Sequence, residues 1–135
     1  LSVNGLPRHE GPLGGVLAAM RRCVAPYLAV LPCDVPFFPN DVLGRLLHAL
    51  TQHPQAQVAM VRALQADGSV FVNPVFMLLR RSVLAQLENY FEHGGRKITT
   101  WAAQAGLVVV DFVESQHAKA FADADTVDEL NHLAL

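Results

Sequence analysis

Hydrophobic residues recur along this chain in two alternating patterns. Continuous apolar runs, typical of strands buried on both faces, alternate with segments in which apolar residues repeat at helical spacing. The predicted strands are LSV, YLAVLP, AQVAMVRA, VFVNPVFMLLR and LVVVDFV. The fourth run holds one or two strands broken at Pro74, because proline cannot donate a hydrogen bond to a ladder. Alternation of this kind predicts an α/β fold with three layers.

Helices are predicted between these strands. They run from Pro12 to about Cys23, from a cap at Asn40 to about His53, from Ser82 to about His93, from Ile98 to Gln104, and onward from a capping box at 126–129. In the second helix, the residues at buried spacing are Val42, Leu43, Leu46, Leu47 and Leu50. Each predicted helix is therefore expected to cover a face of the sheet.

Composition supports this architecture and limits the function. The 135 residues fit one domain, 1–135, and the charged share of 16% is low beside a hydrophobic share of 52%. A net charge of −2 provides no basic field for nucleic acid. No apolar run approaches the ~18 residues of a membrane span, and no signal peptide is visible. Cys23 and Cys33 form no CxxC pair, so reduced thiols and a cytoplasmic location are expected.

Asp34 is the single carboxylate that ends the apolar run YLAVLP. Ligands of open α/β sheets collect just beyond the carboxyl ends of strands. A carboxylate there suits Mg²⁺, which prefers oxygen ligands and is commonly shared with substrate phosphates. An Asx turn, in which Asp34 bonds its own backbone next to Pro36, explains the residue equally well. Position alone leaves both interpretations open.

Two glycine-containing segments stand at predicted helix starts. GPLGG, which contains Gly11, Gly14 and Gly15, offers free N–H groups and a positive helix dipole to an anion. It matches neither Walker A nor GxGxxG, and a tight loop entering a packed helix also explains it. GGRKIT adds Arg96 and Lys97, two cations that can clamp a phosphate or form a solvated helix start.

Three further polar residues stand in unusual places. Asn73, next to Pro74 in an apolar run, either satisfies a bulge or faces a ligand. Asp123 and Asp125 precede the last capping box, and one of them fits a plain N-cap. Together with Asp34 at the same sheet edge, they would form a second place for a metal or a polar substrate group.

Several classes of site are not supported. The six histidines include no HExxH and no paired Cys/His motif. His48 and His53 are expected on different helix faces. No GxSxG elbow accompanies a Ser-His-Asp triad, and basic patches interleaved with aromatic residues are absent.

The order of these motifs is more specific than any one of them. GPLGG, LPCDVPF, NPVF, GGRKI and FADADTVDEL follow one another along essentially the whole chain. In this order the chain resembles the molybdenum cofactor guanylyltransferase family. The resemblance implies the Rossmann-like nucleotidyltransferase fold, which is also that of nucleotide-diphospho-sugar transferases and molybdopterin cytidylyltransferases. The element PCDxP favours the guanylyl branch, since cytidylyl relatives more often carry Gly where Cys33 stands.

The resemblance assigns roles to residues in the first part of the chain. Asp34 matches the family's Mg²⁺-binding aspartate. Gly15 matches a glycine of the guanine-nucleotide site, and Gly11 and Gly14 belong to the same segment. Asn4 stands where the family commonly has an aspartate that contacts the nucleotide.

Roles are also implied later in the chain. Asn73–Pro74 matches a short polar–proline element near the pterin side. Arg96 and Lys97 fall in a loop that the family uses at its active site. Asp123 and Asp125 align with an N-x-N-T-P-E-E-L segment in which asparagines are usual.

One family element is not matched. The family opens with a strand and a Gly-rich loop resembling G-G-x-S-x-R-M-G-x-x-K, which cradles the triphosphate. None of the 135 residues matches it, and the chain begins at Leu1 as if within a strand. We therefore expect an N-terminally incomplete version of the fold, with an exposed sheet edge that favours a homo-oligomer.

The resemblance implies nucleotidyl transfer in the biosynthesis of bis-molybdopterin guanine dinucleotide. The terminal phosphate of molybdopterin attacks the α-phosphate of GTP, and pyrophosphate leaves. GTP and molybdopterin are then the substrates, Mg²⁺ on Asp34 the cofactor, and molybdenum cofactor carrier or acceptor proteins the partners; no nucleic acid or membrane is involved. The alternatives are a cytidylyl or sugar-phosphate nucleotidyltransferase, or a non-catalytic nucleotide- or pterin-binding module, which Asn4 favours.

Overall fold

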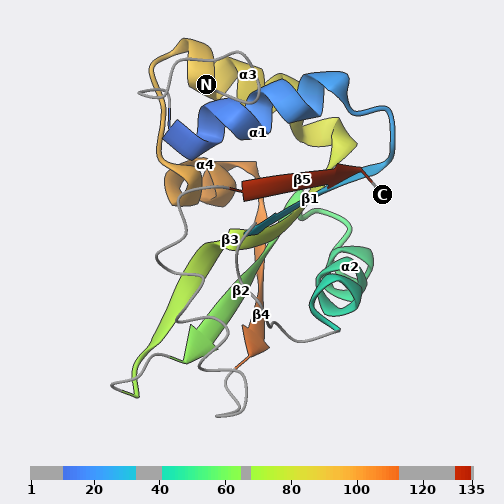
Figure 1. The fold of residues 1–135 in the computed structure, drawn as a ribbon, viewed down its shortest axis with the longest axis vertical. Helices are drawn as coiled ribbons and strands as arrows, with labels where there is room; N and C mark the ends of the chain where they lie inside the picture. Colours follow the sequence, from blue (N-terminus) through green and yellow to red (C-terminus); the bar gives the residue numbers. More distant parts are fainter. Residues whose placement is uncertain (1–10, 33–40, 65–67, 113–129, 135) are drawn as a thin grey trace.

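Helices and strands alternate along the chain, as the sequence predicts. The computed structural model describes residues 11–32, 41–64, 68–112 and 130–134. In chain order the elements are α1 (Gly11–Arg22), β1 (Tyr27–Pro32), α2 (Val42–Gln52), β2 (Val58–Leu64), β3 (Val70–Arg80), the short 3-10 turn η2 (Arg81–Val83), α3 (Leu84–Glu92), α4 (Ile98–Ala105), β4 (Leu107–Phe112) and β5 (Leu130–Ala134) (Figure 1). Every element from α1 to β4 that the apolar pattern predicts within these residues is present.

The strands form one mixed sheet, in the order β4–β2–β3–β1–β5. The β2–β4 pair is parallel, whereas the β1–β3, β2–β3 and β1–β5 pairs are antiparallel. It follows that β1, β2 and β4 point in one direction and β3 and β5 in the other. The edge at which β1, β2 and β4 all end is called the carboxyl edge below.

Helices cover both faces of this sheet (Figure 1). On one face, a buried cluster joins α1, α3 and α4 to the central strands. On the other face, a second cluster packs under α2. In β1, Leu28 and Val30 belong to the first cluster and Ala29 to the second, because successive side chains of a strand point to opposite faces. The three-layer α/β fold expected from the sequence is therefore confirmed.

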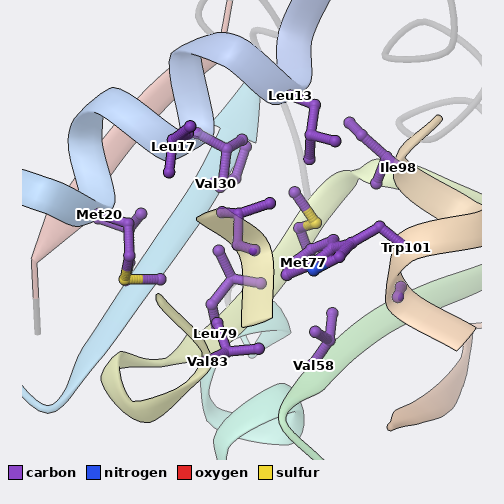
Figure 2. Packing of buried hydrophobic residues seen from close by; sticks show 14 of the residues in the cluster. Leu13, Leu17, Met20, Val30, Val58, Met77, Leu79, Val83, Ile98 and Trp101 are labelled. Carbon is purple, nitrogen blue, oxygen red and sulfur yellow. The ribbon is translucent and has the colours of Figure 1, made fainter. Parts of the chain in front are cut away.

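Trp101 of α4 is the largest fully buried side chain of the first cluster. Figure 2 shows its indole ring reaching from α4 toward Met77 of β3. The indole N–H donates to the side-chain oxygen of Gln86 in α3, which satisfies the one polar atom of the ring. The apolar residues that recur at helical spacing in α1 are buried in the same cluster; they are Leu13, Val16, Leu17 and Met20.

The stripe predicted for α2 is wrong in its width. Val42, Leu46 and Leu50 are fully buried, and Leu43 is half-buried and packs against the same cluster, but Leu47 is 39% exposed. Successive helical residues are about 100° apart, so residues next to the central line turn away from the sheet. A helix that lies alone on its face, as α2 does among the described elements, buries only the narrow line.

Two predicted helix starts also differ. The helix expected after a cap at Asn40 begins at Val42, and Asp41 stands at the N-cap position without a side-chain hydrogen bond. Asn40 itself lies outside the described residues. The helix expected from Ser82 begins with the turn η2 and becomes α-helical at Leu84. Such tighter turns are common at helix ends.

The largest correction concerns the last predicted helix. Its capping box lies outside the described residues, but the residues after it form strand β5 instead of continuing a helix. β5 pairs with β1 in a register that runs from Leu28↔Ala134 to Pro32↔Leu130. The ladder satisfies backbone groups on the side of β1 away from β3, so tertiary pairing outweighs local helix propensity here.

Candidate functional site

The carboxyl edge is the place where the chain segments that carry the predicted site residues leave the sheet. Asp34 follows the end of β1, and Asp123 and Asp125 are in the segment that follows β4. Because β1 and β4 point the same way, these two segments leave at the same edge. Asp34, Asp123, Asp125 and also Asn4 lie outside the described residues, so their roles stay predictions.

The backbone of Asn73–Pro74 lies in an irregular part of β3. The pairing of β2 with β3 jumps from Met60↔Met77 to Val61↔Asn73. Residues 74–76 are therefore left without partners in β2, and the bulge accommodates a proline that has no N–H to donate. β1 pairs with β3 as far as Val30↔Met77, so Asn73–Pro74 lie beyond the end of that pair at which β1 finishes. The expected break at Pro74 is confirmed as a bulge within one strand.

The glycine-rich segment forms the first turns of α1, which begins at Gly11. Gly14 is buried and Gly15 is half-buried. α1 leads directly into β1 and packs back over it, so its N-terminus lies toward the end at which β1 finishes (Figure 1). This places the start of α1 on the side of the carboxyl edge.

The loop between α3 and α4, Gly94–Lys97, is called the GGRK loop. Its Arg96 folds back onto the end of α3. The Nη1 atom of Arg96 donates to the carbonyl oxygens of Phe91, at 2.8 Å, and Gly95, at 2.7 Å. The Cζ atom of Arg96 lies 3.6 Å from the centroid of the Phe91 ring, within the range of a cation–π contact.

Tyr90 of α3 also contacts this loop. A Cβ atom added to Gly95 would overlap the Tyr90 ring, with three ring carbons closer than 3.0 Å. Glycine is therefore needed at this position for close approach. The Tyr90 hydroxyl donates to the backbone oxygen of Lys97 at 3.2 Å.

Lys97 is placed differently from Arg96. Its backbone oxygen accepts a hydrogen bond from the N–H of Trp101 in the first turn of α4. Its side chain is exposed, and among the described residues its ammonium makes no ion pair or hydrogen bond. Leu13 of α1 and Ile98, the residue after Lys97, belong to the same buried cluster, and both figures show the start of α1 beside α4. The GGRK loop and the start of α1 are thus neighbours.

Sequence reasoning missed a group of charged residues near the carboxyl edge. Arg62 of β2 donates to Asp111 of β4 from Nε to Oδ1 at 2.5 Å and from Nη2 to Oδ2 at 2.9 Å. These hydrogen bonds, together with the attraction of the carboxylate, raise the pKa of Arg62. Arg45 of α2 donates to the backbone oxygen of Asp111 at 2.5 Å and lies 3.8 Å over the Phe112 ring. The sequence signal that could have revealed the pair was one charged residue inside each of two apolar runs, Arg62 in AQVAMVRA and Asp111 in LVVVDFV.

Other candidate chemistry is weak in the part of the chain that the structure describes. No group of three or more His, Cys, Asp or Glu residues could hold a metal there, and no helix there could cross a membrane. Cys23 is a buried free thiol. A groove of about 470 Å³ lies between α2 and β4, and its border includes His48 of α2 and His53, the residue that follows α2. None of the predicted site residues that the structure describes lines this groove.

Known proteins resemble the chain in sequence. The model of the MobA-like NTP transferase domain matches residues 3–108. A Molybdenum cofactor guanylyltransferase of Methylibium petroleiphilum is 42% identical over 130 residues, which cover 94% of this chain and 62% of that protein. One of Bordetella pertussis is also 42% identical over 130 residues, covering 96% of this chain and 64% of that protein. The chain thus spans less than two thirds of the length of these curated relatives.

The fold also has a counterpart among solved structures. A crystal structure of the protein Aq1419 from Aquifex aeolicus VF5 superposes with a TM-score of 0.55. The match covers 76% of this chain and 50% of that one, at 15% sequence identity. At this identity the likeness concerns the fold alone, and it agrees with the mixed three-layer architecture described above.

Proposed function

Because this chain belongs to the family of MobA-like NTP transferase domains, we propose that the protein transfers GMP from GTP to molybdopterin and releases pyrophosphate. The product would serve the formation of bis-molybdopterin guanine dinucleotide. The observation that carries this proposal is the 42% identity, over 94% of the chain, to a relative named as a Molybdenum cofactor guanylyltransferase. The motif order and the arrangement around the carboxyl edge support it.

Mg²⁺ is the cofactor we propose, with Asp34 as its protein ligand. Near this edge, two acids among the described residues already face arginines: Asp111 bonds Arg62, and a carboxylate oxygen of Asp41 lies 4.0 Å from Arg45. Asp34, just past the end of β1, is the carboxylate whose position fits a ligand at the carboxyl edge. When bound, Mg²⁺ neutralises phosphate charge as the reaction proceeds.

The residues of the chain would act mainly by positioning. A terminal phosphate oxygen of molybdopterin forms a bond to the α-phosphorus of GTP while the bond to the β-phosphate oxygen breaks. The ammonium of Lys97 would hold a phosphate, and the start of α1 would approach the nucleotide through Gly11, Gly14 and Gly15. Asn73–Pro74 would lie on the pterin side. Such a reaction requires oriented substrates and balanced charge, but no covalent bond to the protein.

The test is a turnover assay on the full-length gene product with GTP, molybdopterin and Mg²⁺, in which pyrophosphate and the dinucleotide are both measured. We expect GTP to be preferred over CTP. Asp34→Asn should lower turnover by about a hundredfold or more, since loss of a group that stabilises developing charge has effects of that size. Asp41→Asn is the matched control, because Asp41 is an exposed acid at the start of α2. A preference for CTP would contradict the guanylyl assignment.

A non-catalytic nucleotide- or pterin-binding module is the second candidate, favoured by Asn4. Thermal-shift titration with GTP separates the two, since an enzyme should show a nucleotide effect that depends on Mg²⁺ and disappears in Asp34→Ala. Nucleotide binding without Mg²⁺ dependence and without turnover would favour the module.

A further inference from the structure

The two cations of the GGRK loop have different surroundings, which suggests different tasks. Arg96 is engaged with the loop and with α3, whereas the ammonium of Lys97 has no partner among the described residues. We propose that Arg96 is a positioning residue that holds the GGRK loop in one shape, so that Lys97 is the cation of this loop that meets a phosphate. The phosphate as ligand rests on the proposed function, but the positioning role does not.

The guanidinium of Arg96 makes two kinds of contact with the end of α3 and its own loop. Its Nη1 atom donates to two carbonyl oxygens, and its Cζ atom lies over the Phe91 ring. A phosphate that bound Arg96 through Nη1 would have to replace these hydrogen bonds, and one that drew the group away from α3 would also break the ring contact. Lys97 would lose nothing of that kind, because its charge sits at the end of an exposed flexible side chain.

The contacts of Arg96 also reach the backbone next to Lys97. Arg96 bonds the carbonyl of Gly95, and the Gly95 N–H donates to the carbonyl of Tyr90 at 3.0 Å. Tyr90 in turn lies against Gly95 and bonds the carbonyl of Lys97. The backbone on either side of Arg96 is thus tied to α3. A change at Arg96 should therefore be felt at Lys97 without any direct contact between Arg96 and substrate.

The experiment compares hydrogen exchange and steady-state kinetics in the full-length protein with the variants Arg96→Gln, Arg96→Lys, Lys97→Gln and Lys97→Arg. Arg21→Gln is the matched control, since Arg21 is another exposed arginine, paired with Glu88 at 3.0 Å. Exchange is read at the amides of Gly94 and Gly95, which donate to carbonyls of α3. Exchange does not depend on activity, so it tests the positioning role separately from the proposed function.

Arg96→Gln should speed exchange at Gly94 and Gly95 about fivefold or more, because hydrogen bonds from a charged group and a ring contact are lost. It should also lower kcat. Arg96→Lys should return neither the exchange rate nor kcat to the wild-type value, since an ammonium cannot bond both carbonyls and lie flat on the ring. Lys97→Gln should raise KM and leave exchange unchanged, and Lys97→Arg should retain most activity.

Two results would overturn the proposal. One is normal exchange in Arg96→Gln together with a raised KM in that same variant, which would make Arg96 a substrate ligand. The other is full restoration by Arg96→Lys, which would mean that charge alone is required. If the wild-type protein shows no guanylyl transfer, the proposed function fails, and unchanged exchange in Arg96→Gln would then by itself refute the positioning role.

Phe91→Leu provides a second variant that keeps an apolar side chain but removes the ring. It should speed exchange in the loop as Arg96→Gln does. Because Arg96→Gln already removes the contact with the ring, the double variant should exchange only slightly faster than Arg96→Gln alone. Effects that multiply fully would contradict the shared contact.

Discussion

Arg62 and Asp111, register partners on the parallel strands β2 and β4, form a two-pronged ion pair with hydrogen bonds of 2.5 and 2.9 Å. Arg45 adds a hydrogen bond to the backbone oxygen of Asp111. The end of β4 is thereby tied to β2 and to α2. The segment with Asp34 leads into α2, and the segment with Asp123 leaves β4. This arginine–aspartate group therefore lies where both segments meet the described part of the fold.

The first prediction concerns Asp111→Asn, which removes the charge but keeps the size of the side chain. We expect a slightly lower melting temperature in low salt, because both partners are about half exposed and such pairs are weak. The difference from wild type should shrink as salt rises. Melting by circular dichroism in low and high salt checks this, and equal melting temperatures in low salt would contradict it.

A second prediction concerns Arg80, which fastens the end of α2 to the sheet. Its Nε atom donates to the carbonyl of Ala56 at 2.8 Å, and its Nη2 atom donates to the carbonyl of Leu50. Arg80→Ala should lower the free energy of unfolding by about 1–3 kcal/mol, since a half-buried charged donor and its acceptors are involved. Urea unfolding measures the change.

Arg80→Lys is the comparison for that prediction. A lysine keeps the charge but cannot point two fixed donors at two carbonyls, so most of the loss should remain. Recovery of wild-type stability in Arg80→Lys would show that charge, and not the forked geometry, fastens α2.

Apolar spacing was enough to predict most elements of this fold. Leu13, Val16, Leu17 and Met20 recur at helical spacing, whereas YLAVLP is a continuous apolar run, and the packing follows both patterns. The Pro74 bulge was predictable for a similar local reason, since the missing N–H is a property of the residue itself. β5 was not predictable, because its partner β1 is far away in the sequence and the local pattern favoured a helix.

In the candidate site, too, some features follow from the local sequence and others depend on contacts between distant residues. The GGRK segment was recognised from residue types, but the separate surroundings of Arg96 and Lys97 depend on Phe91 and Tyr90, which a helical pattern alone does not place. The width of the α2 stripe likewise depended on how many neighbours surround that helix. Residue types were therefore enough to identify Arg96 and Lys97 as candidates, whereas the three-dimensional contacts were needed to propose a different role for each.

The third prediction tests the width of the buried stripe of α2 with two neighbouring leucines. Leu46→Ala should lower the free energy of unfolding by about 2–5 kcal/mol because Leu46 is fully buried. Leu47→Ala should cost much less, since Leu47 is 39% exposed. The reporter is Trp101, the only tryptophan of the chain, which lies in the cluster on the opposite face of the sheet.

Leu46→Ala should lower the midpoint of urea unfolding measured by Trp101 fluorescence, although Leu46 and Trp101 lie in different clusters. The two clusters share the central strands, so a single cooperative transition is expected. If Leu46→Ala shifts the urea midpoint measured by circular dichroism but not the midpoint measured by fluorescence, the two layers unfold separately.

The fourth prediction compares two Gly→Ala changes with opposite signs. Gly44 is an exposed position inside α2 where an added Cβ meets nothing within 4 Å, so Gly44→Ala should stabilise the protein by about 0.5–1 kcal/mol. Gly95→Ala should destabilise it by about 1–3 kcal/mol, since the new methyl group would overlap the Tyr90 ring.

The overlap at Gly95 gives this prediction a direct check. Tyr90→Ala removes the ring, so Gly95→Ala made in that background should cost far less than in the wild type, and urea unfolding of the four proteins measures the coupling. An equal cost in both backgrounds would show that the backbone of Gly95, and not its contact with Tyr90, requires glycine. If the coupling is found, hydrogen exchange at Gly94 should rise in Gly95→Ala as well, because the displaced ring also carries the hydroxyl that bonds Lys97.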